Sequence, residues 1–387
     1  MPDLGRAAAA LRRALKLYLR GERDRARRLV VDGTVLLRIP ASPSPTLRQV
    51  LEVLGPVGRA VPRLAEAADI IVPVYDGAVH LRRLLDTLFE RTDPRHRLLL
   101  ADDGSTDPEV AALLAMAATR PSVTVTRSDR NRGFVATVNA AMAATHGNAV
   151  ILNSDTEVPP AWIERLLRPI ALSDSVASAA PFSNAAQIFS VPTPNQDHDL
   201  PQGAGTIEID RAFARLLPDA DANLEAPTTI GFCMAISRRA WNTLGPFDAE
   251  AFGRGYCEET DWCLRARAAG WSNRLVPDLF VFHQHGGSFA DRDRRALLEA
   301  NLTTLYRRWP RYYGELARFR RRDPWAVYRA AALLALATDP DQAQNAAILG
   351  YDGNRPTRME IRVGHWRIGL IAETADEARQ LQSVRVP

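Results

Sequence analysis

DIIVPVY, at residues 69–75, is a short apolar run rich in β-branched side chains, which predicts a buried strand. Working outward from it, the sequence predicts further strands and helices in alternation. The strands are expected at 97–101, 123–127 and 149–152, and the helices at 79–89, 108–119 and 134–145. Strands and helices that alternate at this spacing predict an α/β fold with a doubly wound, parallel sheet.

Three of these predicted strands end in distinctive residues. They are Pro73-Val74-Tyr75-Asp76, Asp102-Asp103 and Asn153-Ser154-Asp155. In open α/β sheets the ligand crevice lies outside the carboxyl ends of the strands. We therefore expect the three clusters to line one crevice.

Carboxylates in such a crevice suit a nucleoside diphosphate when a divalent cation lies between them. Mg²⁺ or Mn²⁺ bridges carboxylate and phosphate oxygens and neutralises a diphosphate leaving group. Asp155 is the best candidate ligand, and Asp102 could instead accept hydrogen bonds from a base or a ribose hydroxyl. Taken alone, DDGSTD at 102–107 is also a good turn with a helix N-cap, which leaves the roles of Ser105 and Asp107 open.

A second acidic cluster, Glu258-Glu259-Thr260-Asp261-Trp262, opens a helix predicted to run to Ala269. Acids in a first turn favour the helix dipole, so the cluster alone requires no function. His283 and His285 follow in a glycine-rich stretch and alternate on a strand or extended loop, so they point the same way. A lone histidine is usually structural, whereas two after an acidic helix favour a functional role.

Together these motifs resemble those of the family 2 glycosyltransferases, which have the GT-A fold. The resemblance covers about residues 68–312. It rests on IIVPVY (70–75), ADDGSTD (101–107), NRGF (131–134) with Asn139, LNSDT (152–156), the acidic region from Glu258 to Arg265, and Phe282-His283. Ser183-Asn184 resembles a family element near the sugar.

The resemblance implies a donor site for a nucleotide sugar. Asp102 takes the base-binding role, while Asp155 and His283 hold Mg²⁺ or Mn²⁺. Asn153 departs from the family's D-x-D segment, in which an aspartate occupies this position, so metal affinity is expected to be lower. The nucleotide-sugar-binding residues implied are Pro73, Tyr75, Asp102, Asp103, Asn131, Gly133, Asn139, Asn153, Ser154 and Asp155.

The resemblance also implies the catalytic residues. An inverting transfer needs a carboxylate that takes the proton of the acceptor hydroxyl as its oxygen attacks the anomeric carbon. Glu259 aligns with the family's base, which is usually an aspartate, and Asp261 is the alternative base. Glu258 would orient the acceptor, and Arg265 would pair with these acids.

The function predicted is a metal-dependent, inverting transfer of a hexosyl or deoxyhexosyl group to an acceptor hydroxyl in polysaccharide or glycoconjugate synthesis. The departures at Asn153 and Glu259 motivate an alternative, a catalytically degenerate transferase that serves as a sugar-binding or partner scaffold. A sugar nucleotidyltransferase would need a glycine-rich phosphate loop after the first strand. Residues 73–78 offer no such loop.

Composition bounds the class of protein. With 46% hydrophobic and 24% charged residues, the chain is an ordinary globular protein, neither disordered throughout nor fibrous. Its longest apolar stretches, such as 331–337, fall short of the roughly 20 residues that a membrane span needs. No secretory signal is evident, so we expect a cytoplasmic enzyme. Cys233, Cys257 and Cys263 are expected to be free thiols.

The two ends of the chain differ from its centre. The predicted domains are an N-terminal helical extension and linker (1–66), the GT-A catalytic domain (67–312) and a C-terminal helical and hairpin extension (313–387). An amphipathic helix is expected at 4–30, a helix at 325–337 and a hairpin at 358–370. Basic residues concentrate at 12–28 and 307–322, which leaves peripheral contact with the inner face of a membrane open. No nucleic-acid-reading motif accompanies them, and the oligomeric state is open.

Overall fold

The structure is a computed structural model that describes residues 2–218, 224–284, 291–350 and 357–383. Its contacts divide the chain into two compact units, Met1–Pro43 with Asp291–Trp325, and Ser44–Ala290 with Ala326–Pro387. The predicted boundaries at 66 and 312 do not coincide with these units. Each terminal extension contributes to the larger unit, and the three-domain division stays a prediction.

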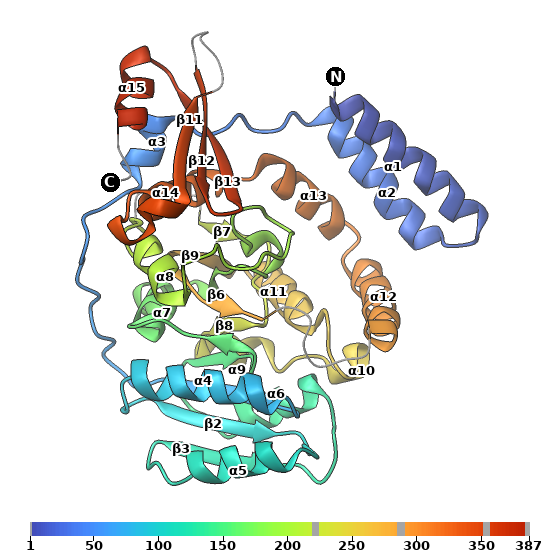
Figure 1. Cartoon of the computed structure of the whole chain (residues 1–387). Helices are drawn as coiled ribbons and strands as arrows, with labels where there is room; N and C mark the ends of the chain where they lie inside the picture. Colours follow the sequence, from blue (N-terminus) through green and yellow to red (C-terminus); the bar gives the residue numbers. More distant parts are fainter. Residues whose placement is uncertain (1, 219–223, 285–290, 351–356, 384–387) are drawn as a thin grey trace. The chain divides into compact units, whose positions relative to one another are not determined.

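The larger unit is built on an eight-stranded sheet in the order β3-β2-β1-β4-β8-β6-β9-β7 (Figure 1). The predicted strands β1 to β4 pair in parallel as 3-2-1-4, which confirms the doubly wound arrangement. β8 and β7 run antiparallel to their neighbours, so the sheet is mostly parallel. The bounds are β1 (Asp69–Val74), β2 (Arg97–Asp102), β3 (Val123–Arg127), β4 (Ala149–Leu152), β6 (Val176–Phe182), β7 (Glu225–Ala226), β8 (Cys233–Ile236) and β9 (Ser272–Phe280).

Apolar residues on both faces hold this sheet between helices. Ile71 belongs to a core cluster that it shares with Met142 and Trp262, from the helices α6 (Phe134–Ala143) and α11 (Glu258–Ala268). The alternate residues Ile70 and Val72 are also fully buried and point to the opposite face. Burial of each such side chain contributes about 1.5–3 kcal/mol to folding. Burial on both faces explains why β1 reads as a continuous apolar run.

The other helices of the larger unit connect and cover these strands. They include α4 and α5, which form where the sequence predicted helices. The helix predicted to begin with the acidic cluster at Glu258 also forms, as α11. The bounds are α3 (Leu47–Glu52), α4 (Ala78–Arg91), α5 (Pro108–Ala117), α7 (Trp162–Leu172), η1 (Gln187–Phe189), α8 (Thr206–Phe213), α9 (Arg238–Leu244) and α10 (Ala249–Phe252).

The C-terminal segment packs within the same unit. α14 (Ala326–Ala337) is almost entirely buried and contacts α8 and β12, which explains its run of alanines and leucines. The predicted hairpin is present as β12 (Thr357–Val363) and β13 (Trp366–Ala372), and β11 (Ala346–Gly350) adds a third strand. The short helices η2 (Pro340–Asn345) and α15 (Ala375–Ser383) complete the segment.

The smaller unit is helical. The single helix predicted at 4–30 is instead two helices, α1 (Pro2–Leu19) and α2 (Arg23–Arg38), because Gly21 turns the chain with a φ of +80°. They pack as a hairpin (Figure 1). α12 (Asp291–Arg308) and α13 (Tyr312–Arg322) join it, with an Arg28–Glu299 ion pair of 2.6 Å and a hydrogen bond of 2.7 Å from the Tyr313 hydroxyl to Asp32. Among the described helices, none has the length and apolar character to cross a bilayer.

Candidate active site

Asp102 ends β2 as a buried, fully engaged carboxylate. Its Oδ1 accepts a hydrogen bond of 2.9 Å from the backbone N–H of Ser105. Its Oδ2 pairs with an Arg127 guanidinium nitrogen at 2.6 Å. Arg127 remains half exposed, so the ion pair places a cation beside the residue predicted to bind the base.

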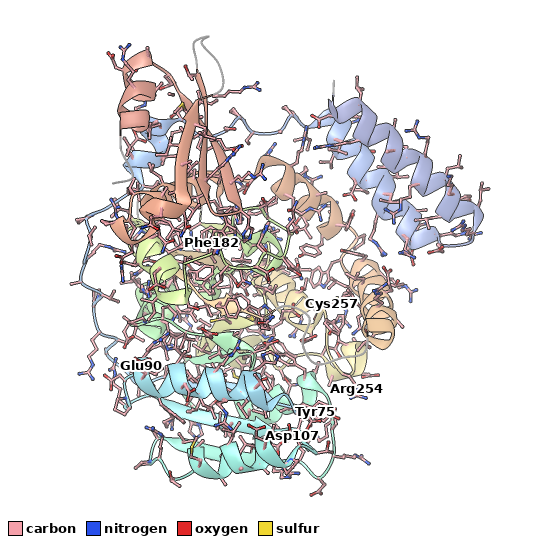
Figure 2. The ribbon with its side chains drawn as sticks, in the orientation of Figure 1. Tyr75, Glu90, Asp107, Phe182, Arg254 and Cys257 are labelled. Atoms are coloured by element: carbon pink, nitrogen blue, oxygen red, sulfur yellow. The ribbon has the colours of Figure 1, made fainter. Side chains whose placement is uncertain are left out.

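The segment after Asp102 confirms the turn that the sequence left open. The Asp76 carboxylate accepts hydrogen bonds from the N–H groups of Thr106 (2.7 Å) and Asp107 (3.0 Å). The Asp76 N–H donates to the Ser105 hydroxyl at 3.0 Å, and Asp107 caps α5 by accepting from Glu109 at 2.9 Å. Ser105 and Asp107 therefore stabilise the turn and join the ends of β1 and β2. Figure 2 labels Asp107 and also Tyr75, the residue that directly follows β1.

Asp103 shapes the loop that carries Asn131 and Gly133. Its two oxygens accept hydrogen bonds of 2.8 Å from the N–H groups of Arg132 and Gly133. Asn131 accepts a hydrogen bond of 2.9 Å from Arg254. Gly133 has a φ of +91°, and a Cβ there would lie 2.7 Å from the Arg254 Cα. Only glycine fits this conformation and this approach.

Asn139 lies on α6, and its amide is engaged elsewhere. Its Nδ2 donates to the Phe247 carbonyl at 2.9 Å, and its Oδ1 accepts from the Phe247 N–H at 3.1 Å. These bonds hold the turn after α9 against α6. The geometry lends no support to the predicted contact between Asn139 and the nucleotide sugar.

The turn after β4 is fixed through its backbone. The Asn153 N–H donates to the Phe232 carbonyl at 2.8 Å, and the Asp155 carbonyl accepts from the Gln284 N–H at 2.9 Å. β5 (Thr156–Glu157) then pairs with β10 (Phe282–His283) in a two-stranded ribbon. This ribbon brings the N-x-D segment and the histidine segment together.

The side chains of Asp155 and His283 face each other in this ribbon. His283 Nε2 lies 3.4 Å from Asp155 Oδ1, an ion-pair approach without hydrogen-bond alignment. The other ring nitrogen, Nδ1, lies 2.7 Å from the Ala185 carbonyl oxygen, which can only accept. Nδ1 therefore carries the proton, and in the neutral ring Nε2 presents its lone pair to Asp155. Burial lowers the pKa of His283, but the Asp155 carboxylate and the carbonyl of Ala185 outweigh it, so the pKa is raised.

This pair has the chemistry of a divalent-cation site. In the described structure Asp155 Oδ1 is buried and receives no hydrogen bond. A free carboxylate oxygen beside an imidazole with a fixed tautomer fits Mg²⁺ or Mn²⁺. The described residues hold no cluster of three or more His, Cys, Asp or Glu side chains suited to a metal.

Asn184 positions His283 from the neighbouring strand end. It is fully buried, accepts from the His283 N–H at 2.9 Å and donates to the His283 carbonyl at 2.9 Å. The Phe232 ring also stacks on the imidazole at 5.0 Å. The sequence placed Ser183-Asn184 near the sugar but gave no sign of this clamp, since 99 residues separate Asn184 from His283.

Glu258 and Glu259 open α11 as two acids in a desolvated environment. Glu258 is buried, and the half-buried Glu259 lies against Gly231, where a Cβ would stand 3.6 Å from its Cγ. Each carboxylate has one oxygen, Oε2, that is buried without a hydrogen-bond partner in the described structure. Burial raises the pKa of Glu259 and outweighs hydrogen bonds from backbone N–H groups, which lower it, so the pKa is raised overall. Burial and the charge of Glu259 raise the pKa of Glu258 further.

Asp261, the alternative base, is engaged in the interior. It is fully buried, and its Oδ2 accepts a hydrogen bond of 3.1 Å from Arg265, which also donates to the Leu244 carbonyl at 2.6 Å. The predicted pairing of Arg265 with these acids is therefore confirmed for Asp261. Between the two candidate bases, this geometry favours Glu259.

The chain entering α11 is strained and tied to the loop around Gly133. Tyr256 and Cys257 have φ values of +71° and +76°, a conformation that costs non-glycine residues of order 1–3 kcal/mol each. The Arg254 carbonyl accepts a hydrogen bond of 3.0 Å from the Phe134 N–H, just after Gly133. Figure 2 labels Arg254 and Cys257 in this segment. The contacts connect the loop around Gly133 to the acid-bearing helix.

Three further sequence predictions concern the same region. The three cysteines are buried free thiols, as expected, and burial raises the pKa of Cys263 to about 11. Pro73 and Tyr75 lie half-buried at the end of β1, and Ser154 lies half-buried after β4. His285 lies outside the described residues.

A hollow of about 560 Å³ lies at the opposite edge of the sheet. Its lining includes Glu66, which precedes β1, and His146, Gly147 and Asn148, which precede β4. These positions are at the amino ends of the strands, whereas the three polar clusters are at the carboxyl ends. The hollow is therefore separate from the candidate site.

Comparison with known proteins identifies the family of this region. Residues 69–245 match the model described as "Glycosyl transferase family 2". Over 264 residues the chain is 25% identical to the N-acetylglucosaminyl-diphospho-decaprenol L-rhamnosyltransferase of Mycobacterium tuberculosis, a match that covers 63% of this chain and 84% of that protein. Over 115 residues it is 30% identical to the undecaprenyl-phosphate 4-deoxy-4-formamido-L-arabinose transferase of Sodalis glossinidius, covering 28% of this chain and 35% of the other.

Two solved structures superpose on part of this chain. The mannosyltransferase PcManGT of Pyrobaculum calidifontis, in complex with GDP-Man and Mn²⁺, superposes with a TM-score of 0.48 at 18% identity. The match covers 77% of this chain and 84% of that one. GalNAc-T7 with UDP, GalNAc and Mn²⁺ gives a TM-score of 0.45 at 18% identity, over 67% of this chain and 56% of the other.

Proposed function

We propose how this enzyme, a glycosyltransferase with a family 2 domain at residues 69–245, performs its reaction. It transfers a hexosyl or deoxyhexosyl group from a nucleoside-diphosphate sugar to an acceptor hydroxyl, with inversion and with a divalent metal. The observation that carries this proposal is the Asp155–His283 pair, which lies at the end of β4. Three neighbouring strand ends and two desolvated glutamates complete the site.

The donor nucleoside binds at the ends of β1 and β2. The Asp102 carboxylate, held in place by Arg127, accepts a hydrogen bond from the base. Pro73 and Tyr75 lie at the same end of the sheet. The loop of Asn131 and Gly133, shaped by Asp103, and the turn of Asn153 and Ser154 bound the diphosphate and the sugar. In this proposal Asn139 and Asp103 act through the loops that they fix.

Asp155 and His283 hold the metal, Mg²⁺ or Mn²⁺. When bound, the metal neutralises the charge of the departing diphosphate. The rest of the chain holds the Asp155 and His283 side chains facing each other. Asn184 clamps the His283 backbone, and the Ala185 carbonyl fixes the imidazole tautomer.

Glu259 acts as the base. Its carboxylate takes the proton of the acceptor hydroxyl while the acceptor oxygen forms a bond to the anomeric carbon. The bond between that carbon and the diphosphate oxygen breaks on the opposite face, and the nucleoside diphosphate leaves with the electron pair. A raised pKa suits this role, because a stronger base accepts the proton more readily. Glu258, adjacent on α11, orients the acceptor.

The acceptor is a saccharide or glycoconjugate. The names of two relatives contain polyprenyl phosphate or diphosphate acceptors, which motivates a lipid-linked glycoconjugate here. Such an acceptor presents its sugar at a membrane surface, so we propose that the enzyme works at the inner face of the membrane.

A thermal-shift panel tests the donor site. The purified chain is melted with UDP, dTDP, GDP or CDP, each with Mn²⁺ or with EDTA. Ligand at a hundredfold its Kd adds about 2.7 kcal/mol, a rise of several degrees in Tm. We expect a rise with one nucleotide that disappears in EDTA. No shift with any nucleotide would reject the metal-dependent donor site and favour the scaffold alternative.

A further inference from the structure

Charge is divided unequally between the two compact units. Residues 1–43 and 291–325 contain 20 Lys and Arg against 9 Asp and Glu, a net charge of +11. The whole chain has a net charge of +4, so the larger unit carries −7. The helical unit is therefore strongly cationic on a chain that is otherwise acidic, which directs any attraction to an anionic surface through this unit.

The hairpin of α1 and α2 is packed with small residues. Ala7, Ala14 and Ala26 are at most 4% exposed, and Gly33 is buried. A Cβ on Gly33 would lie 3.1 Å from the Leu11 side chain, so the two helices approach closely there. Leu11 lies partly against α2 at this approach, whereas the other large apolar residues on the same face of α1 are mostly exposed.

The large apolar residues on this face of α1 form an apolar stripe. It comprises Leu4 (58% exposed), Leu11 (38%), Leu15 (60%), Tyr18 (58%) and Leu19 (77%). Their spacings of seven, four, three and one residues place them on one face of α1. Isolated exposed leucines are common, but a stripe of five large apolar residues along one helix marks an interaction surface.

Cations flank the stripe. Arg12 and Lys16 of α1 and Arg20, the residue that follows the helix, recur at intervals of four, so they form a row beside the apolar residues. All three are exposed. On the other helix, Asp32 of α2 bonds to Tyr313 and faces Arg320 of α13 at 3.5 Å. From α1, Asp3 pairs with Arg321 of α13 near the beginning of the helix. The row of cations lies toward the other end of α1.

We propose that α1 docks the enzyme onto an anionic lipid bilayer, with the apolar stripe in the interfacial layer and the row of cations on the lipid headgroups. An amphipathic helix with this division binds membranes in plane, without crossing them. A nucleic acid would bind the cations, but its phosphate backbone would not bury the exposed leucines. A second copy of the same cationic unit would be repelled by its charge. This deepens the proposed function, because a lipid-linked acceptor would be met at that surface.

The test is vesicle co-sedimentation of the full chain. Vesicles of neutral phosphatidylcholine are compared with vesicles that contain 30% phosphatidylglycerol. We expect binding to the anionic vesicles only, and weaker binding as salt screens the cations. The variant Leu15→Ser/Leu19→Ser should lower the partition coefficient by at least about tenfold for each leucine removed from the interface.

A second variant and matched controls isolate the two contributions. Arg12→Gln/Lys16→Gln/Arg20→Gln should reduce binding to anionic vesicles while leaving the stripe intact. The controls, in the larger unit, change exposed residues of the same kinds and should bind as the parent does. They are Val57→Ser/Leu172→Ser and Arg83→Gln/Arg358→Gln/Arg367→Gln. Circular dichroism confirms that each variant is folded.

Several outcomes would overturn the docking proposal. Equal binding of parent and stripe variant, or no binding to anionic vesicles, would reject it. A dimer in light scattering that Leu15→Ser/Leu19→Ser dissociates would assign the stripe to a second copy instead. The donor thermal shift is measured on the same variants without vesicles, so a failure of the donor site is distinguishable from a failure of docking.

Discussion

His283 Nε2 lies 3.4 Å from Asp155 Oδ1, although Asp155 lies in the turn before β5 and His283 lies in β10, far apart in the chain. The β5–β10 ribbon creates this proximity, and Asn184 and the Ala185 carbonyl orient the imidazole within it. The carboxylate oxygen receives no hydrogen bond in the described structure. In the proposed function, this pair holds the divalent cation.

Asp155→Asn and His283→Ala should each abolish the Mn²⁺-dependent rise in Tm with nucleotide and reduce transfer to background. Each variant removes one of the two side chains that would hold the metal, so a metal would be bound more weakly. Asp174→Asn, at an exposed carboxylate, is the matched control. Turnover like that of the parent in Asp155→Asn would refute the metal assignment.

Asn184→Ala should raise the Mn²⁺ concentration required for half-maximal thermal shift by about 10–100-fold. The Asn184 amide bonds to both the N–H and the carbonyl of His283. Without these bonds, the imidazole of His283 is no longer held opposite Asp155. Activity should recover at high Mn²⁺, which a general loss of folding would not allow. An unchanged Mn²⁺ requirement would show that the clamp is dispensable.

Glu259→Gln should keep nucleotide binding and lose turnover by about 10²–10⁴-fold, because the amide cannot take the acceptor proton. Isothermal titration and initial rates separate the two effects. Asp261→Asn is the comparison, and its main effect should be on Tm, since it removes the buried partner of Arg265. If Glu259→Gln remains active, Asp261 becomes the base.

The pH profile of kcat/KM should have its acid limb above the ordinary glutamate pKa of about 4.3. Burial raises the pKa of Glu259, so the base is protonated, and transfer fails, at a higher pH than for an exposed glutamate. Rates measured with saturating metal across the acidic range check this. A limb at or below the ordinary value would contradict it.

Glu258→Gln should stabilise the fold at neutral pH. The pKa of Glu258 is raised in the folded state, so its contribution to stability is present below the unfolded pKa and is lost as pH rises through the folded one. Removing the buried charge should raise the free energy of unfolding by roughly 1–3 kcal/mol near pH 7. Near pH 4 the difference should shrink toward zero. Urea denaturation at both pH values measures it, and an equal effect at both would point to packing instead of ionisation.

The sequence by itself determined the parallel strands β1 to β4 and the resemblance of this region to a known family. Local signals were sufficient, because β-branched runs bounded by turns predict β1 to β4, and their alternation with helices dictates a parallel order. The rule that ligands bind at the carboxyl ends of strands then predicted the donor side of the site. It also selected Asp102 and Asp155 as candidates, whereas the glutamates of α11 were selected by the family resemblance.

Tertiary structure decided what each candidate is free to do. Asp261 and Glu259 lie two residues apart on one helix, yet Arg265 engages the first while the second keeps an unbonded oxygen. Asn139 is engaged by Phe247, and Asn184 is drawn to His283. Which groups form a hydrogen bond depends on their proximity in space and on their burial. Strand pairing determines the proximity and the burial of groups from segments that are far apart in the sequence. The sequence therefore identified the candidate side chains, and the tertiary packing determined which hydrogen-bond partner each of them has.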